Sequence, residues 1–171
     1  KLPKDVMPAV MKNIAKMEKK TGKKWNSTKN PLLVSVRSGA AISMPGMMDT
    51  ILNLGLNEKT VEGFAEQTKN PRFSWDSYRR FIQLFGKVVF GVNDEKFDHV
   101  LDSAKKKQGV TDDSKLNVES LKKIVSEYKK ICEKHTKRKF PDTPDEQLVL
   151  SIEAVFKSWM GERAIVYREK N

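Results

Sequence analysis

The stretch that decides the fold is LLVSVRSGAAISMPGMMDTILNLGL, residues 32–56. It opens with Leu32 to Val36, a short apolar run rich in β-branched residues, which is typical of a buried strand that ends at Arg37. Small residues dominate from Ser38 to Gly46. They predict a loop, because small residues let the backbone turn tightly and approach a ligand closely. Met47 to Leu54 is then predicted to form a short helix ahead of a glycine.

Helical patterns lie on both sides of this stretch. Apolar residues at three- and four-residue spacing predict an amphipathic helix over Asp5 to Lys20, which Gly22 ends. About eighty residues after the stretch read as helices, and the aromatic-rich run Phe73 to Phe90 should be the central one. The breaks between them are predicted at Asn70-Pro71, Gly91, Gly109 and Pro141.

The C-terminal part returns to a mixed pattern. Pro144 to Trp159 predicts a helix, with Asp142 or Thr143 as its N-cap and proline in its first turn. The apolar run Ala164 to Tyr167 predicts a strand.

The predicted fold class is therefore α+β, predominantly helical. We expect an N-terminal segment with a strand and a loop over residues 1–57, an all-helical inserted subdomain over residues 58–140, and a return helix and strand over residues 141–171. Two strands make an incomplete sheet, so we expect them to belong to a larger sheet or to pair between subunits.

Composition excludes several classes of protein. The length of 171 residues and the single cysteine, Cys132, argue against a disulfide miniprotein and favour a reducing compartment. We expect no membrane segment and no secretory signal, because no apolar run is long enough. The net charge of +11 favours polyanions. The lysines, however, are spread along helical patterns without interleaved aromatics, so a solvated surface is the favoured interpretation over nucleic-acid binding.

The chemistry that residues 32–56 suggest is phosphate binding. Backbone N–H groups of a small-residue loop followed by a helix can hold an anion, and a guanidinium at a strand end adds a bidentate clamp. The pattern alone is weak. It contains neither a P-loop nor the dinucleotide-binding glycine motif, and a glycine-rich turn after a strand is more often only a turn.

A family resemblance adds to this interpretation. Residues 33–55 are similar to the signature of pyruvate, phosphate dikinases. The run Asn70 to Phe85 also resembles that family, as do Ala154 to Trp159 and Arg163 to Arg168, so the resemblance covers nearly the whole chain in order. The related pyruvate, water dikinases share a Val-Arg-Ser start, but their continuation is expected to be acidic, unlike the run that begins at Met44.

The resemblance implies part of an ATP-grasp nucleotide-binding domain. In the family, ATP phosphorylates a histidine on a swivelling domain, and the net reaction converts ATP, phosphate and pyruvate to AMP, diphosphate and phosphoenolpyruvate. Arg37 matches the family arginine that contacts the nucleotide's phosphates and is the predicted catalytic residue. Further phosphate-binding residues are predicted at Ser38, Gly39, Ala40 and Arg80.

The resemblance also implies cofactors and partners. Mg²⁺ would neutralise the phosphate oxygens, with ligands expected outside this chain, and no metal ligand is predicted within it. ATP, AMP, phosphate, diphosphate and the swivelling phosphohistidine domain are the expected partners of a homo-oligomeric enzyme without membrane contact. The expected compartment is the cytoplasm, with the glycosome and the plastid as alternatives.

Several features are expected to be structural only. His99 and His135 are interpreted as surface or cap residues, and Trp75, Tyr78 and Phe81 as core residues. Surface ion pairing is the ordinary expectation for Arg79 and Arg80. Because adjacent helical residues point about 100° apart, at most one of the two should face a shared ligand.

The chain lacks the family's Gly-Gly-Lys-Gly segment and its other domains, so we expect a fragment that is inactive alone. Two alternatives stay open: a fragment of a pyruvate, water dikinase, and a stand-alone basic helical module that binds nucleic acid or an acidic protein.

Overall fold

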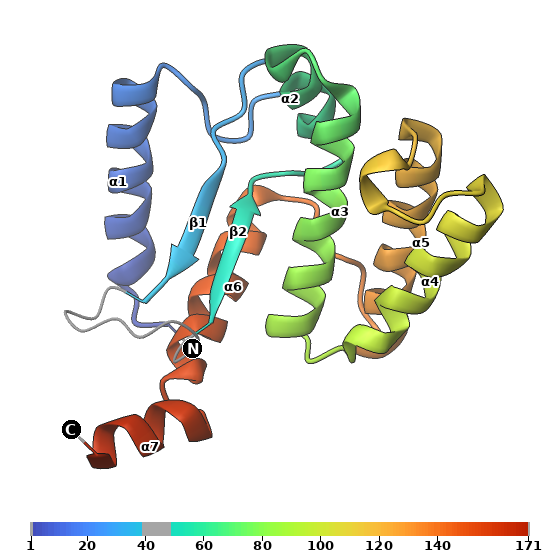
Figure 1. The fold of residues 1–171 in the computed structure, drawn as a ribbon. Helices are drawn as coiled ribbons and strands as arrows, with labels where there is room; N and C mark the ends of the chain where they lie inside the picture. Colours follow the sequence, from blue (N-terminus) through green and yellow to red (C-terminus); the bar gives the residue numbers. More distant parts are fainter. Residues whose placement is uncertain (1, 39–48, 171) are drawn as a thin grey trace.

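The computed structural model describes residues 2–38 and 49–170. In chain order, the elements are α1 (Val6–Thr21), β1 (Val34–Arg37), β2 (Thr50–Leu54), α2 (Thr60–Thr68), α3 (Pro71–Val88), α4 (Asp94–Gln108), the short 3₁₀ helix η1 (Asp113–Lys115), α5 (Val118–Thr136), α6 (Pro144–Ser158) and α7 (Glu162–Lys170). The α1, β1, β2 and α6 elements lie on one side, and α4 and α5 lie beyond α3 on the other (Figure 1). This mostly helical arrangement confirms the predicted α+β class.

The described strands β1 and β2 form an antiparallel pair. Val34 pairs with Leu54 and Arg37 pairs with Thr50, with an irregularity between Val34 and Val36. The prediction of a helix over Met47 to Leu54 is wrong for residues 50–54, and Met47 and Met48 lie outside the described residues. The apolar strand β1 needs a hydrogen-bonding partner. β2 supplies it and buries its own Ile51.

Helix α1 follows the prediction closely. It ends at Gly22, whose positive φ of 69° gives the left-handed cap expected of glycine. Its apolar stripe covers a small core in which Ile14 packs with Leu32 and Leu148. This core joins α1 to the start of the β1 segment and to α6.

Helix α3 is the centre of the main core, as predicted. Asn70 caps it by accepting a hydrogen bond from the Phe73 backbone N–H, and proline occupies its first turn. Trp75, Tyr78 and Phe81 are buried, which confirms their structural interpretation. The same core includes residues of β2, so the helical segment and the strand pair share one apolar interior.

Helices α4 and α5 pack through an aromatic contact. The rings of Phe97 and Tyr128 are 4.8 Å apart in an edge arrangement, and the Tyr128 hydroxyl donates to the Phe97 carbonyl at 3.1 Å. Burial raises the pKa of that hydroxyl to about 12. Asn93 and Asn117 cap the two helices.

A buried amide holds α6 against the strand pair. Gln147 is fully buried and accepts a hydrogen bond from the Gly55 N–H at 3.1 Å. It also donates to the carbonyl groups of Leu56 and Pro141, both at 3.0 Å. Because each of these polar groups would otherwise be buried without a partner, the amide fixes the position of α6. Thr143 is the N-cap of this helix, as predicted.

Lys129 of α5 joins the helical segment to the rest of the chain. Its ammonium contacts Glu58 at 3.0 Å and Asp142 at 2.8 Å, and its side chain is only 11% exposed. Burial alone would lower its pKa, but Tyr78 and the two carboxylates more than offset this effect, so the pKa is raised. These ion pairs lie where the segments around residues 58 and 140 meet.

The C-terminal prediction is wrong in secondary structure. Ala164 to Tyr167 lies within α7, not in a strand. The Gly161 carbonyl accepts hydrogen bonds from the backbone N–H groups of Ala164 and Ile165, which start the helix. A short apolar run is ambiguous between helix and strand, and here good helix formers flank it. Among the described residues, no helix is both long enough and apolar enough to cross a membrane.

Candidate functional site

Arg37 is the last residue of β1, and its side chain is exposed. The strand alternates half-buried and exposed residues, which puts Val36 towards the interior and Arg37 outward. Within the described part of the chain, the Arg37 guanidinium makes no hydrogen bond and no ion pair. It is therefore available to a ligand at the point where the small-residue segment begins.

An apolar cleft of about 540 Å³ opens beside Arg37. Its lining comes from α1, β1 and α6: Val6, Val10, Val36, Arg37, Ser38, Ile152, Val155, Phe156 and Trp159. Arg37 is the one charged residue of this lining. The site therefore combines an apolar wall with a single guanidinium at its edge.

Two aromatic side chains of α6 contribute to this wall. Phe156 is 60% exposed and Trp159 is 40% exposed, which is unusual for side chains of their size. The Arg168 guanidinium of α7 lies 4.4 Å from the Trp159 ring centre and also donates to its backbone carbonyl at 2.6 Å. One ring is thus held in place, and the other faces the solvent.

The structure describes only part of the predicted phosphate-binding set. Ser38 is half-buried and lines the cleft with Arg37, so these two residues are brought together. Gly39 and Ala40 lie outside the described residues. At the far end of the segment, the Asp49 backbone N–H donates to Ser158 of α6 at 3.3 Å.

Arg80 does not line the Arg37 cleft. It lies on α3, which packs against β2, whereas the cleft lies on the side of α1 and α6 (Figure 1). Its side chain is 63% exposed and contacts Asp76 at 3.1 Å. Arg80 therefore keeps a surface ion pair, and its predicted contact with phosphate stays a prediction.

Arg79 corrects the expectation of surface pairing. Its side chain is only 3% exposed and contacts the other oxygen of Asp76 at 2.7 Å. It also lies 3.6 Å from Asp113, beyond α4. The two adjacent arginines thus point apart, as helical geometry requires, and the buried one is structural.

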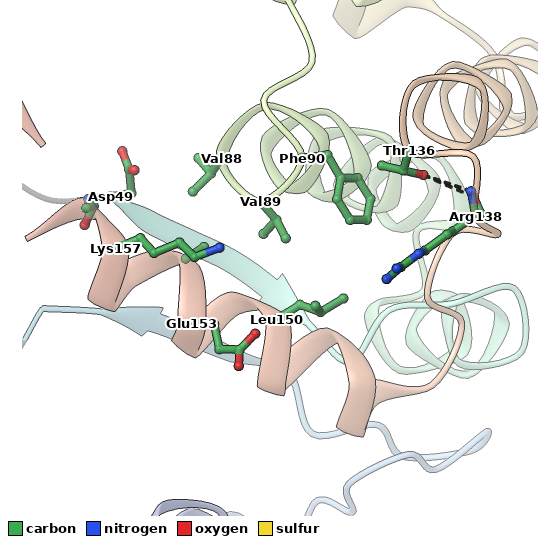
Figure 2. Close-up of a pocket in the computed structure, with 11 residues that line it drawn as sticks. Asp49, Val88, Val89, Phe90, Thr136, Arg138, Leu150, Glu153 and Lys157 are labelled. Carbon is green, nitrogen blue, oxygen red and sulfur yellow. Dashed lines mark hydrogen bonds between the residues drawn. The ribbon is translucent and has the colours of Figure 1, made fainter. Parts of the chain in front are cut away.

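A second cleft, of about 520 Å³, lies between the end of α3, the end of α5 and α6. Figure 2 shows the Arg138 and Lys157 side chains approaching it from opposite ends, beneath Phe90. Glu153 and Asp49 add two carboxylates, so the charges of the lining balance. None of these four charged side chains forms an ion pair within the described part of the chain. A lining without excess positive charge is less suited to a triphosphate than the edge at Arg37.

The aromatic residues of the Arg37 cleft were missed by the sequence analysis. Ile152, Val155, Phe156 and Trp159 recur at helical spacing, which indicates a face but not whether that face is covered. The exposure of Phe156 is the signal, and it becomes visible only with the fold.

The two histidines are exposed, as predicted, and lie on α4 and α5. Across residues 2–38 and 49–170, no group of three or more acidic, histidine or cysteine side chains could hold a metal ion. The residues described here thus do not form a site for Mg²⁺.

Comparison with known proteins identifies the family. Residues 1–171 match the family described as pyruvate phosphate dikinase, AMP/ATP-binding domain. The chain belongs to this family of AMP/ATP-binding domains. The match confirms the resemblance predicted from residues 33–55 and makes the Arg37 cleft a candidate nucleotide site.

Named relatives of this domain come from distant organisms. The chain is 52% identical over 169 residues to "Pyruvate, phosphate dikinase" of Giardia intestinalis, covering 99% of the chain and 19% of that protein. It is 47% identical over 171 residues to the protein of that name from Clostridium symbiosum, covering 99% and 20%. "Pyruvate, phosphate dikinase 1, chloroplastic" of Arabidopsis thaliana is 44% identical over 171 residues, covering 100% and 18%. The chain thus spans about a fifth of the length of these relatives.

Proposed function

We propose that the chain is the nucleotide-binding portion of a pyruvate, phosphate dikinase and that Arg37 contacts the phosphates of its ATP. The observation that carries the proposal is the exposed Arg37 guanidinium, which has no partner among the described residues and stands at the edge of an apolar cleft. The family membership supports a nucleotide as the ligand. ATP has an apolar base at one end and a polyanion at the other, as this cleft requires.

Each part of the cleft would have a distinct role. The guanidinium fork would hold two phosphate oxygens at once and stay charged at any physiological pH. The exposed Phe156 ring offers a face to a planar base. Backbone N–H groups from Ser38 onward, including those of Gly39 and Ala40, would add donors. Phosphoryl transfer depends mainly on positioning and electrostatic stabilisation, which such groups supply.

The finer fold assignment belongs to this proposal. The chain would be part of an ATP-grasp domain, with residues 58–140 as an inserted helical subdomain between residues 1–57 and 141–171. The arrangement of α1, β1, β2 and α6 to one side of α3 supports this division (Figure 1). Arg80, on the exposed side of α3, would reach the phosphates only if the helical subdomain closes over the nucleotide.

The proposed reaction is that of the named relatives' family. ATP phosphorylates a histidine carrier on another domain, and the complete cycle converts ATP, phosphate and pyruvate to AMP, diphosphate and phosphoenolpyruvate. Within this cycle, the residues described here would bind and orient the nucleotide and exclude water from its base. Mg²⁺ would neutralise phosphate oxygens, but the described residues do not form its site and no role of theirs depends on it.

The remaining partners and the compartment follow from the same proposal. We expect a homo-oligomer in contact with a swivelling phosphohistidine domain, in the cytoplasm or in an organelle such as the plastid named for the Arabidopsis thaliana relative. The relatives reported above are all named pyruvate, phosphate dikinase, so they give no support to a pyruvate, water dikinase or to a stand-alone basic module.

Nucleotide binding to the 171-residue chain tests the site. ATP should raise the midpoint of thermal unfolding, because a ligand that binds only the folded state stabilises it. Arg37→Ala should weaken this effect about tenfold or more in ATP concentration. Arg138→Ala is the matched control, since it removes an exposed arginine from the other cleft. Equal ATP responses of the two variants would contradict the assignment of Arg37.

A further inference from the structure

A groove of about 730 Å³ runs between α4 and α5, away from the Arg37 cleft. Five of the residues that line it carry a lysine or histidine side chain, and all five are exposed: Lys96, His99, Lys134, His135 and Lys137. Glu95 is the one carboxylate of this lining. We call this surface the basic groove.

The floor of the basic groove is apolar. Val100 of α4 and Ile131 of α5 are half-buried, and both pack against the main core. They are therefore held rigidly, and each leaves part of its surface open to a ligand. A purely ionic ligand would leave this floor without a partner.

The positive charge of the basic groove is not balanced by the neighbouring acids. Lys96, Lys134 and Lys137 form no ion pair within the described part of the chain, and the same holds for the two imidazoles. Acidic side chains on the same two helices are engaged elsewhere: Asp94 with Lys87, Asp102 with Lys105, and Glu127 with Lys130. The field at the groove therefore favours an anionic ligand.

Helix electrostatics explain only part of this cluster. Lys134 and His135 lie in the last turn of α5, where a cation interacts favourably with the helix dipole. Lys96 lies in the first turn of α4, where the dipole disfavours a cation. Lys137 holds the left-handed cap of α5 at a φ of 60°, a position that glycine usually takes. Neither Lys96 nor Lys137 is a residue that helix stability would choose.

We infer that the basic groove binds an acidic peptide segment of a partner protein, with an apolar side chain of that segment seated on Val100 and Ile131. The inference is independent of the proposed nucleotide site. An acidic peptide supplies both carboxylates and an apolar side chain, which matches the lining. The lining holds no arginine and no aromatic ring, the groups that bind phosphate bidentately and stack on bases, so nucleic acid fits it less well.

Fluorescence anisotropy with a labelled peptide tests the inference. The probe is a short run of glutamates with one central leucine, and the protein is the 171-residue chain. The double reversal of Lys96 and Lys134 to Glu should weaken binding at least about tenfold. The control reverses Lys12 and Lys16 to Glu, two exposed residues of α1 that give the same change in net charge. Equal weakening by both pairs would overturn the inference, because binding would then follow net charge alone.

Two further arms separate this groove from a general anion site. Replacing the probe's leucine with serine should weaken binding several-fold, and an unchanged affinity would overturn the role of the floor. Tripolyphosphate and oligothymidylate are the competitors. If either displaces the peptide more effectively than unlabelled peptide does, at equal charge, the acidic peptide is the wrong occupant.

A last variant separates binding from stability. Lys137→Gly removes a groove cation and also relieves the left-handed conformation, so it should weaken peptide binding while raising the midpoint of thermal unfolding. A stabilised variant with unchanged affinity would show that Lys137 does not face the bound peptide and would count against the groove.

Discussion

Arg37 pairs with Thr50 in the antiparallel register of β1 and β2. This pairing holds together the two ends of the small-residue segment that links the strands. Ser158 of α6 then anchors the Asp49 N–H at the far end. The proposed phosphate-binding residue thus stands on a strand end fixed by its neighbour, which is how a charged group is positioned for a ligand at low entropic cost.

The buried pair of Asp76 and Arg79 predicts a large effect on stability. Asp76→Ala would leave the Arg79 guanidinium, only 3% exposed, without its carboxylate. Loss of one partner from a buried ion pair costs about 3–5 kcal/mol. Arg80→Ala removes the exposed partner of the same carboxylate and should cost at most about 1 kcal/mol. Urea denaturation of both variants checks the difference, and equal losses would contradict the structural role of Arg79.

Buried Cys132 predicts a loss of stability at alkaline pH. Burial raises the pKa of its thiol to about 12, and Glu133 adds to the effect. The unfolded chain, with an ordinary thiol pKa of about 8.5, loses this proton first. Stability should therefore be intact below about pH 8 and fall as pH rises towards 12.

The slope of that loss identifies the group. Between about pH 8.5 and 10 the free energy of unfolding should fall by on the order of 1 kcal/mol per pH unit. Cys132→Ala should be less stable at neutral pH, because it leaves a cavity, but should show a flatter slope in this window. Tyr128, whose pKa is also raised to about 12, should still give a decline above about pH 10 in both proteins. Identical slopes would rule out the thiol as the cause.

The helical subdomain proposed for residues 58–140 can be tested alone. Its aromatic residues on α3 bury a large apolar area, and each such side chain contributes about 1.5–3 kcal/mol. The core also includes Ile51 and Leu54 of β2, which this piece would lack. We expect a helical circular dichroism spectrum and cooperative unfolding at a lower urea concentration than for the whole chain. A featureless far-ultraviolet spectrum would contradict the boundaries.

Local signals predicted the helices well. The cap at Gly22, the Asn70-Pro71 start of α3 and the Thr143 cap each depend on residues next to one another in sequence. Such signals act through backbone conformation and nearby hydrogen bonds, so they can be read without the fold.

The two errors arose where distant residues decide the structure. Thr50 to Leu54 becomes a strand because β1 pairs with it, and Ala164 to Tyr167 becomes a helix because the Gly161 carbonyl and its flanking residues start one. Of the candidate site, Arg37 and Ser38 were predicted from sequence, whereas Phe156 and Trp159 were not. Their place beside Arg37 depends on the packing of α6 against the strands, which Gln147 fixes from the buried interior.

Arg37→Ala in the dikinase polypeptide that carries this domain tests the central claim most directly, with both half-reactions measured in the same preparation. If the guanidinium contacts strengthen as the phosphoryl group transfers, the ATP half-reaction should slow by a factor on the order of 10²–10³. Arg37→Lys should recover only part of the rate, since it keeps the charge and loses the fork. Transfer from phosphoenolpyruvate to the histidine should be nearly unchanged, because it takes place away from this cleft. An ATP half-reaction within about threefold of the unmodified enzyme would contradict the account.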